Sequence, residues 1–182
     1  MNTTLSRFNE ARQPLEAVLD AVSNDHWSAP SPCEDWSAHD VLTHVIETQR
    51  GFFGERGFDV GAGPDPDADP AAAWRDHARW VADVLKDDSL VAAEYTGYFG
   101  PTTMGETFTQ FYVWDMLVHR WDIATAAGLD AHLTDAEVES IDQGAGAFGD
   151  NLYMDGICKP PLEGDPDGNQ ITRVLAKLGR QT

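Results

Sequence analysis

Cysteine is scarce in this sequence, and long apolar runs are absent from it. Its 182 residues include two cysteines, Cys33 and Cys158, with no Cys-x-x-Cys pair, which excludes a disulfide framework. No stretch of about 18 uncharged apolar residues occurs, so we expect no transmembrane helix. The N-terminal segment MNTTLSRFNEAR is polar and lacks the basic start and apolar run of a secretory signal. We therefore expect a cytoplasmic protein that does not enter a membrane.

Basic residues are also few. The chain has 12 Lys and Arg against 31 Asp and Glu, a formal net charge of −19. A field of this sign repels phosphate backbones, so nucleic-acid binding is disfavoured and a small-molecule substrate is the expected partner. Solubility in a crowded ionic cytoplasm is the simplest explanation of the charge, and a salt-loving source is the alternative.

The apolar residues that are present have mostly helical spacing. Hydrophobic residues make up 42% of the chain, with six Trp and eight Phe, which is the composition of a globular protein. A chain of this length is long enough to bury a sizeable core. We predict an all-α fold, a four-helix bundle with extra short C-terminal helices, as one domain over residues 1–182. The main expected helices cover residues 4–25, 37–56, 70–87, 102–127 and 135–148.

Several boundaries of these helices carry recognisable signals. Ser37 and Asp40 form the S-x-x-D capping pattern, and Thr134 is a candidate N-cap. Gly128 is placed to end the longest helix. Pro14 either kinks the first helix or marks its first turn. The segment 89–104 is ambiguous and can hold a short extended piece before the turn at Gly100.

The expected helix 102–127 carries a polar stripe in an otherwise apolar run. The stretch VWDMLVHRWD places Asp115, His119 and Asp122 on one face of a regular helix, together with Phe111 and Tyr112. Burying an unpaired carboxylate is very unfavourable, so such groups are normally paired or bound to a metal. An Asp and a His four residues apart project in the same direction and can offer two ligands to one ion.

The second helix supplies a candidate third ligand. His44 lies at the edge of its apolar stripe, and a His44, Asp115 and His119 set with an open position is typical of catalytic zinc. Asp122, one turn further on, could accept a hydrogen bond from a ligating imidazole. The alternative is a buried hydrogen-bonded Asp–His couple, or an Asp–Arg network that includes Arg120. The remaining histidines do not have partners at ligand spacing, and polar surroundings are expected for His26, His77 and His132.

Four segments resemble one known family: PSPCEDWSAHDVLTHV, DMLVHRWDIATAAG, PPLEGDPDG and RVLAKLGR. The motifs Pro-Cys-x-x-Trp, Leu-x-His and Asp-x-x-x-His-x-Trp-Asp-x-Ala, in this order, resemble the DinB-like bundle proteins. The resemblance is to their actinobacterial group related to the metal-binding domain of mycothiol-dependent maleylpyruvate isomerase. It covers nearly the whole chain.

The resemblance implies a divalent metal held by His44, Asp115 and His119, most simply zinc, with nickel as the alternative. In the isomerase the middle ligand is a Glu, and Asp115 is one methylene shorter. The family also implies a low-molecular-weight thiol as cosubstrate, such as mycothiol or bacillithiol. The isomerase has a second, C-terminal domain that contributes to its active site, whereas this chain stops soon after the bundle, so we do not expect isomerisation of maleylpyruvate itself.

Two function classes follow from these observations. The first is a metal-dependent thiol S-transferase, or a related enzyme, that acts on a small electrophile, with no catalytic side chain assigned. The second is a non-catalytic module that binds a metal or a small ligand. A homodimer through the aromatic face around Trp114 and Trp121 is a further expectation. An anionic substrate would need Arg50, Arg56 or Arg120.

Cys33 is expected to have no catalytic role. A nucleophilic cysteine needs a base or a cation nearby, and Glu34 and Asp35 are its acidic neighbours in the sequence. The loop that contains Cys33 is instead expected to seat Trp36 against the bundle.

Overall fold

The computed structural model of the protein describes residues 1–154, 156–163 and 168–181. The chain forms two compact units, Met1–Ala131 and His132–Thr182. The predicted all-α fold is confirmed, because the described residues are mainly helical with a small two-stranded sheet. A single domain over residues 1–182 stays a prediction. Among the described residues, no helix combines the length and the apolarity that crossing a membrane requires.

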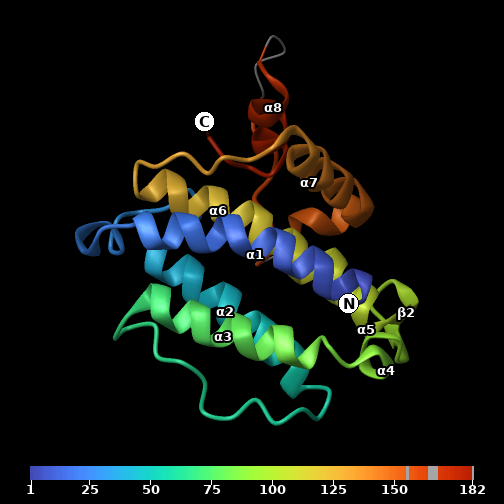
Figure 1. The fold of residues 1–182 in the computed structure, drawn as a ribbon. Coiled ribbons are helices and arrows are strands. Elements are labelled where there is room, and N and C mark those ends of the chain that lie inside the picture. The colour runs from blue at the N-terminus through green and yellow to red at the C-terminus, as the bar shows by residue number, and fades with distance from the viewer. Residues whose placement is uncertain (155, 164–167, 182) are drawn as a thin grey trace. The chain divides into compact units, whose positions relative to one another are not determined.

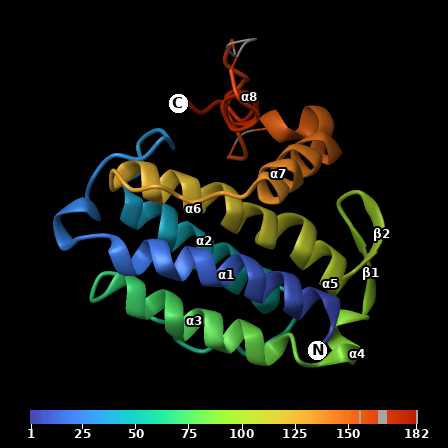
Figure 2. The ribbon, with the colours of Figure 1, turned by 45° about the horizontal axis from the view of Figure 1, so that its top comes forward.

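The first unit is built around a four-helix bundle (Figure 1). Its helices are α1 (Thr3–Ala21), α2 (Ala38–Gly54), α3 (Pro70–Val84) and α6 (Trp114–Ala126). Helices α1 and α2 each contact both α3 and α6. Helices α1 and α6 run in one direction and α2 and α3 in the other, because the loop over residues 55–69 returns along the bundle (Figure 2).

The core of this bundle is formed by large side chains that are fully buried. They come from all four helices and from the segment that precedes α6, and include Phe8, Leu15, Leu42, Phe52, Phe53, Trp74, Phe108, Met116 and Ile123. Phe108 contacts Phe8, Phe52 and Phe53 with ring centroids 5.3–5.9 Å apart, at the distance preferred by aromatic pairs.

The capping signals in the sequence are confirmed. Helix α2 begins with a capping box, in which the Ser37 hydroxyl accepts from Asp40 N and the Asp40 carboxylate accepts from Ser37 N. The hydrogen bonds from Ser37 lower the pKa of Asp40. At the same end of the bundle, Gly128 follows α6 with a φ of 67°, and Leu129 N donates to Ala124 O at 2.8 Å. Pro14 lies inside α1.

The ambiguous segment before α6 contains a β-hairpin. A short helix, α4 (Asp88–Val91), leads into β1 (Glu94–Gly97), which pairs antiparallel with β2 (Gly100–Thr103). The register joins Glu94 to Thr103 and Gly97 to Gly100. The extended piece expected before Gly100 is therefore present.

The prediction of one regular helix over residues 102–127 is wrong for the first half of this range. Helix α5 (Met104–Thr107) passes into a π-helix, η2 (Phe108–Val113), and only then into α6. A π-helix bonds residue i to residue i+5, so this segment holds more residues per turn than an α-helix. The helical-wheel prediction therefore applies from Trp114 onward, and its placement of Phe111 and Tyr112 relative to Asp115 does not.

The second unit carries the short C-terminal helices that the sequence predicts. Helix α7 (Asp135–Phe148) begins with a capping box of Thr134 and Glu137, and α8 (Gln170–Lys177) follows the 3₁₀ segment η3 (Gly149–Tyr153). The segment PPLEGDPDG lies partly outside the described residues.

One histidine has surroundings that differ from the expectation. His77 on α3 was expected in a polar setting, but its side chain is buried between α3 and α2 at 1% exposure. Its Nε2 lies 3.0 Å from Gln49 Oε1, and the rings of Trp74 and Trp80 lie beside it. The buried Gln49 hydrogen bond makes this position compatible with the core.

Candidate metal centre

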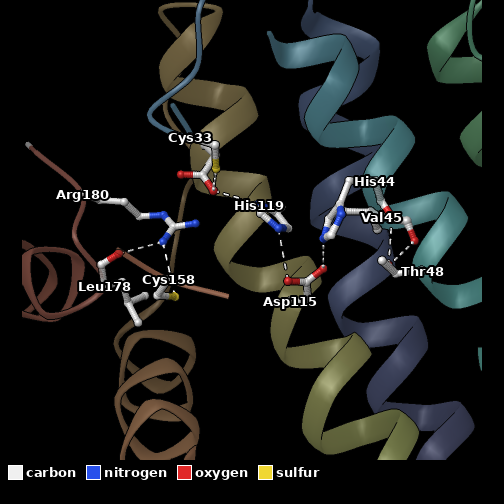
Figure 3. Close-up of polar contacts among 10 residues, drawn as sticks. Cys33, His44, Val45, Thr48, Asp115, His119, Cys158, Leu178 and Arg180 are labelled. Carbon is white, nitrogen blue, oxygen red and sulfur yellow. Dashed lines mark hydrogen bonds and ion pairs between the residues drawn. The ribbon is translucent and has the colours of Figure 1, made fainter. Parts of the chain in front are cut away.

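The structure brings His44, Asp115 and His119 together where α2 passes α6 (Figure 3). Asp115 Oδ1 lies 3.1 Å from His119 Nε2, and Asp115 Oδ2 lies 3.8 Å from His44 Nε2. One donor atom from each of the three residues lies within 4.8 Å of the others. Ligand bonds of about 2.0–2.2 Å place the donors of one zinc ion about 3–4 Å apart. The donor set therefore fits a zinc-sized cation after a small adjustment.

The regular part of the long helix explains the pairing within α6. Asp115 and His119 are one α-helical turn apart, so both project toward α2. His44 reaches them from the antiparallel neighbour α2, flanked by the buried Val41 and Val45. The two imidazole rings meet edge to face, with centroids 5.2 Å apart.

The site has a buried side and an accessible side. The His119 side chain is 7% exposed, whereas those of Asp115 and His44 are 23% and 28% exposed. A cation bound by the three groups would therefore keep contact with solvent on the side of Asp115 and His44. Three protein ligands with an accessible position are characteristic of catalytic rather than structural zinc sites.

Asp122 lies on the buried side, at 0% exposure. Its Oδ2 accepts a hydrogen bond from His119 Nδ1 at 2.8 Å. This arrangement fixes the ring so that Nε2 faces Asp115, as carboxylate partners of metal-binding histidines do.

The charges around His119 favour a positive charge at this place. Burial by itself disfavours the protonated ring, but Asp115 and the hydrogen bonds to Asp115, Asp122 and Cys33 outweigh it and raise the pKa of His119 well above its usual value. The pKa of His44 is lowered, first by burial and then by His119, against the attraction of Asp115. Two carboxylates thus surround one imidazole, and either a proton or a metal ion can balance them.

A further group of potential ligands was missed in the sequence. Cys33 Sγ lies 3.4 Å from Asp122 Oδ2, and Cys33, His119 and Asp122 also place donor atoms within 4.8 Å of one another. The Pro-Cys-x-x-Trp motif was the available signal. The motif did not predict this contact, because Cys33 and Asp122 are 89 residues apart in the sequence and only the tertiary fold brings them together.

Trp36 of the same motif lies against the candidate site. Its ring centroid is 4.8 Å from that of His44, which agrees with the expectation that the loop seats Trp36 against the bundle. Tyr112 packs between Phe52 and Phe108, and burial raises its pKa to about 12. Its phenol therefore stays protonated at neutral pH.

Two of the arginines considered for anion binding are engaged elsewhere. Arg50 donates to the carbonyls of Val60 and Gly61. Arg56 donates to Phe52 O at 2.8 Å and to the Tyr95 hydroxyl at 3.3 Å. These contacts anchor the loop after α2 and the hairpin, so neither arginine supports the expected substrate role. Arg120 is fully buried.

Comparison with known proteins agrees with the sequence motifs. The family described as "Mycothiol maleylpyruvate isomerase N-terminal domain" matches residues 8–124, which include all three candidate ligands. An uncharacterised protein of Mycobacterium tuberculosis, recorded in two strains, is 26% identical over 131 residues, which are 71% of this chain and 70% of the relative. No solved structure matches the chain significantly. The family is associated with mycothiol and with metal binding. The chain therefore belongs to the family of the mycothiol maleylpyruvate isomerase N-terminal domain, a DinB-like family of helical bundles.

Proposed function

We propose that the protein binds a divalent cation through His44 Nε2, the Asp115 carboxylate and His119 Nε2. One observation carries this proposal: donor atoms from α2 and α6 lie within 4.8 Å of one another around a partly buried carboxylate. Zinc is the expected ion and nickel the alternative, because two imidazoles and one carboxylate suit both.

Asp115 is compatible with this role although it is one methylene shorter than the Glu of the isomerase. Asp115 faces both imidazoles at once, with Oδ1 toward His119 and Oδ2 toward His44. An aspartate at this position therefore reaches the place where two histidines converge, without the extra methylene of a glutamate.

We further infer a thiol-dependent transferase acting on a small electrophile, with mycothiol or bacillithiol as the cosubstrate. A zinc ion with an open position lowers the pKa of a bound thiol. In the transfer, a sulfur–carbon bond forms, the leaving group departs with its bonding pair, and the thiol proton passes to solvent. Asp122 orients His119 from the buried side, and the Trp36 ring lies beside His44.

Metal analysis tests the first part of the proposal. Protein purified without an affinity tag should contain close to one zinc or nickel ion per chain, measured by elemental analysis. His44→Ala, Asp115→Asn and His119→Ala should lose it. His26→Ala is the matched control, because His26 is exposed and its imidazole is hydrogen-bonded to the Ser23 hydroxyl, away from the proposed site. Metal-free wild type, or full metal content in all three ligand variants, would refute the site.

An activity assay tests the second part. The metal-loaded protein should accelerate thioether formation between mycothiol or bacillithiol and an aryl halide, measured by mass spectrometry and by loss of free thiol. His119→Ala should abolish the acceleration. Bound metal without any thiol chemistry would instead favour the non-catalytic module.

A further inference from the structure

Cys33 lies behind the proposed metal centre, next to both Asp122 and His119. Its Sγ lies 3.4 Å from Asp122 Oδ2, and the same oxygen accepts from His119 Nδ1 at 2.8 Å. Figure 3 shows Cys33 near His119, whose ring is turned toward Asp115. A continuous set of contacts thus runs from the loop before α2 to His119 Nε2.

The backbone around Cys33 is fixed by a compact turn. Ser31 N donates to Trp36 O at 2.8 Å, and Trp36 N donates to Cys33 O at 3.1 Å. Cys33 N donates to Ser31 Oγ at 3.1 Å. Asp35 has a φ of 64°, the left-handed conformation that lets the chain reverse here. The position of the thiol is therefore set by the loop itself.

The chemistry of the contact defines which group donates. The Cys33 thiol donates and Asp122 Oδ2 accepts, and Asp122 is completely buried. A buried carboxylate is stabilised by each donor that faces it. The thiol and the His119 N–H share Oδ2, so Cys33 helps to determine how the carboxylate is turned.

We propose that Cys33 is a positioning residue of the metal centre. It orients Asp122, which in turn holds His119 with Nε2 toward the cation. This inference rests on the proposed metal site and extends it to a side chain that touches neither the cation nor the substrate.

Direct ligation by Cys33 is the competing arrangement. It would use His119 Nδ1 together with Asp122. The hydrogen bond of 2.8 Å between these two groups would then have to be broken, and the ring would have to serve a cation through the nitrogen that now faces Asp122. If Cys33 only positions Asp122, this hydrogen bond is kept and His119 Nε2 stays available on the side of His44 and Asp115.

Zinc affinity tests the proposal. The full chain, as wild type, Cys33→Ala and Cys33→Ser, is titrated with zinc in competition with a chromophoric chelator. Cys33→Ala should bind zinc about tenfold more weakly, the lower end of the effect seen when partners behind metal ligands are changed. Cys33→Ser retains a donor and should stay within about threefold of wild type. Cys158→Ser is the matched control and should bind like wild type.

Cobalt spectra separate positioning from ligation and from general destabilisation. In the cobalt-loaded protein, Cys33→Ala should shift the ligand-field bands, Cys33→Ser should restore them, and wild type should show no sulfur-to-cobalt charge transfer. A charge-transfer band that Cys33→Ser removes would overturn the proposal in favour of ligation. Folded Cys33→Ala with unchanged zinc affinity and spectrum would overturn it too, while leaving the metal site intact. A wild-type protein that binds no zinc would contradict both the proposed metal site and the positioning role of Cys33.

Discussion

Asp122 shows how one buried carboxylate can organise a site. It is fully buried, and its Oδ2 faces both His119 Nδ1 and Cys33 Sγ. Asp115 is half-buried and faces two imidazoles on the opposite side of His119. The same residue type thus has two settings, which burial separates: the accessible carboxylate is placed to hold the proposed cation, and the buried one accepts the hydrogen bond of His119.

Replacing Asp122 by Asn should weaken zinc binding by about 10- to 100-fold. The amide is nearly the same size but carries no charge, so it is a weaker acceptor for the His119 N–H and for the Cys33 thiol. Chelator competition measures the affinity. Asp76→Asn removes an exposed carboxylate of α3 and is the control. Equal affinities of wild type and Asp122→Asn would contradict the orienting role.

His77 is a second buried imidazole, and its pKa is shifted in the opposite direction to that of His119. Burial, together with the positive charge of Arg50, lowers its pKa to about 3. The unfolded chain takes up a proton near the ordinary histidine pKa, whereas the folded protein does not. The contribution of His77 to stability is therefore complete above about pH 6.5 and is lost as the pH falls from there toward 3.

The variant His77→Gln should remove this pH dependence. Between pH 6.5 and pH 5, the free energy of unfolding of wild type should fall by roughly 1.5 kcal/mol more than that of the variant. The measurement is urea unfolding at several pH values. Comparison within the pair cancels the effect of His119, whose raised pKa has the opposite sign. Parallel pH profiles of the two proteins would exclude a neutral buried His77.

At the scale of the element, α5 approaches its neighbours at a glycine. A Cβ on Gly105 would lie 2.5 Å from Val91 Cγ1 and 2.6 Å from Thr4 Oγ1. The glycine therefore allows close packing among α5, α4 and α1 at the start of the long helical segment. Gly51 on α2 is exposed, with nothing within 4 Å of the same position.

Two glycine substitutions should have opposite effects on stability. Gly105→Ala should lower the free energy of unfolding by about 1–3 kcal/mol, because the methyl group has no room. Gly51→Ala should raise it by roughly 0.5–1 kcal/mol, because alanine loses less backbone entropy in a helix. Chemical unfolding of the pair measures both. A neutral or stabilising Gly105→Ala would contradict the close packing.

The π-helix is the element that helical periodicity did not reveal. The sequence of η2, FTQFYV, contains no signal that distinguishes the i+5 hydrogen bonds of a π-helix from the i+4 hydrogen bonds of an α-helix. Tyr112 nonetheless stacks on Phe108, and both contact Phe52 across the bundle. The π-helix thus packs against α2, and the spacing of apolar residues in the sequence could not predict its geometry.

At the scale of the whole molecule, the net charge of −19 opposes compaction. Ion pairs relieve part of it on the surface, as between Arg75 and Asp20 or Lys177 and Asp142. Exposed pairs of this kind contribute little each. Most of the repulsion is therefore left to screening by dissolved ions.

Added salt should stabilise the protein. Raising NaCl from about 0.02 M to 0.5 M shortens the Debye length from roughly 20 Å to about 4 Å, so the melting temperature should rise and then level off. Differential scanning fluorimetry measures it, and the plateau distinguishes screening from the continuing effect of salts excluded from the surface at higher concentration. A melting temperature that stays constant or falls would contradict self-repulsion.

The homodimer stays a prediction. It was inferred from a long helix with apolar residues on nearly all sides. Trp114 is 8% exposed and Leu117 is 8% exposed within a single chain, and Trp121 is half-buried. Much of the apolar surface that suggested a partner is therefore already covered, and the sequence pattern by itself does not require one.

Local interactions are what the sequence by itself determined. The helix starts at Ser37 and Thr134, the end at Gly128, and the one-turn spacing of Asp115 and His119 all depend on residues within one or two turns of each other. Such features follow from backbone geometry and can be predicted without a tertiary fold.

Tertiary structure decided the features that join distant segments. The meeting of His44 with Asp115 was a hypothesis drawn from the place of His44 on its helix and strengthened by the family resemblance. Spacing could not establish it, since 70 residues of chain separate the two. The contact of Cys33 with Asp122 and the burial of His77 against Gln49 were not anticipated at all. The physical reason is common to all three. Which faces of α2, α3 and α6 meet is set by the packing of the whole core, and that information is spread over the chain rather than held in any one motif.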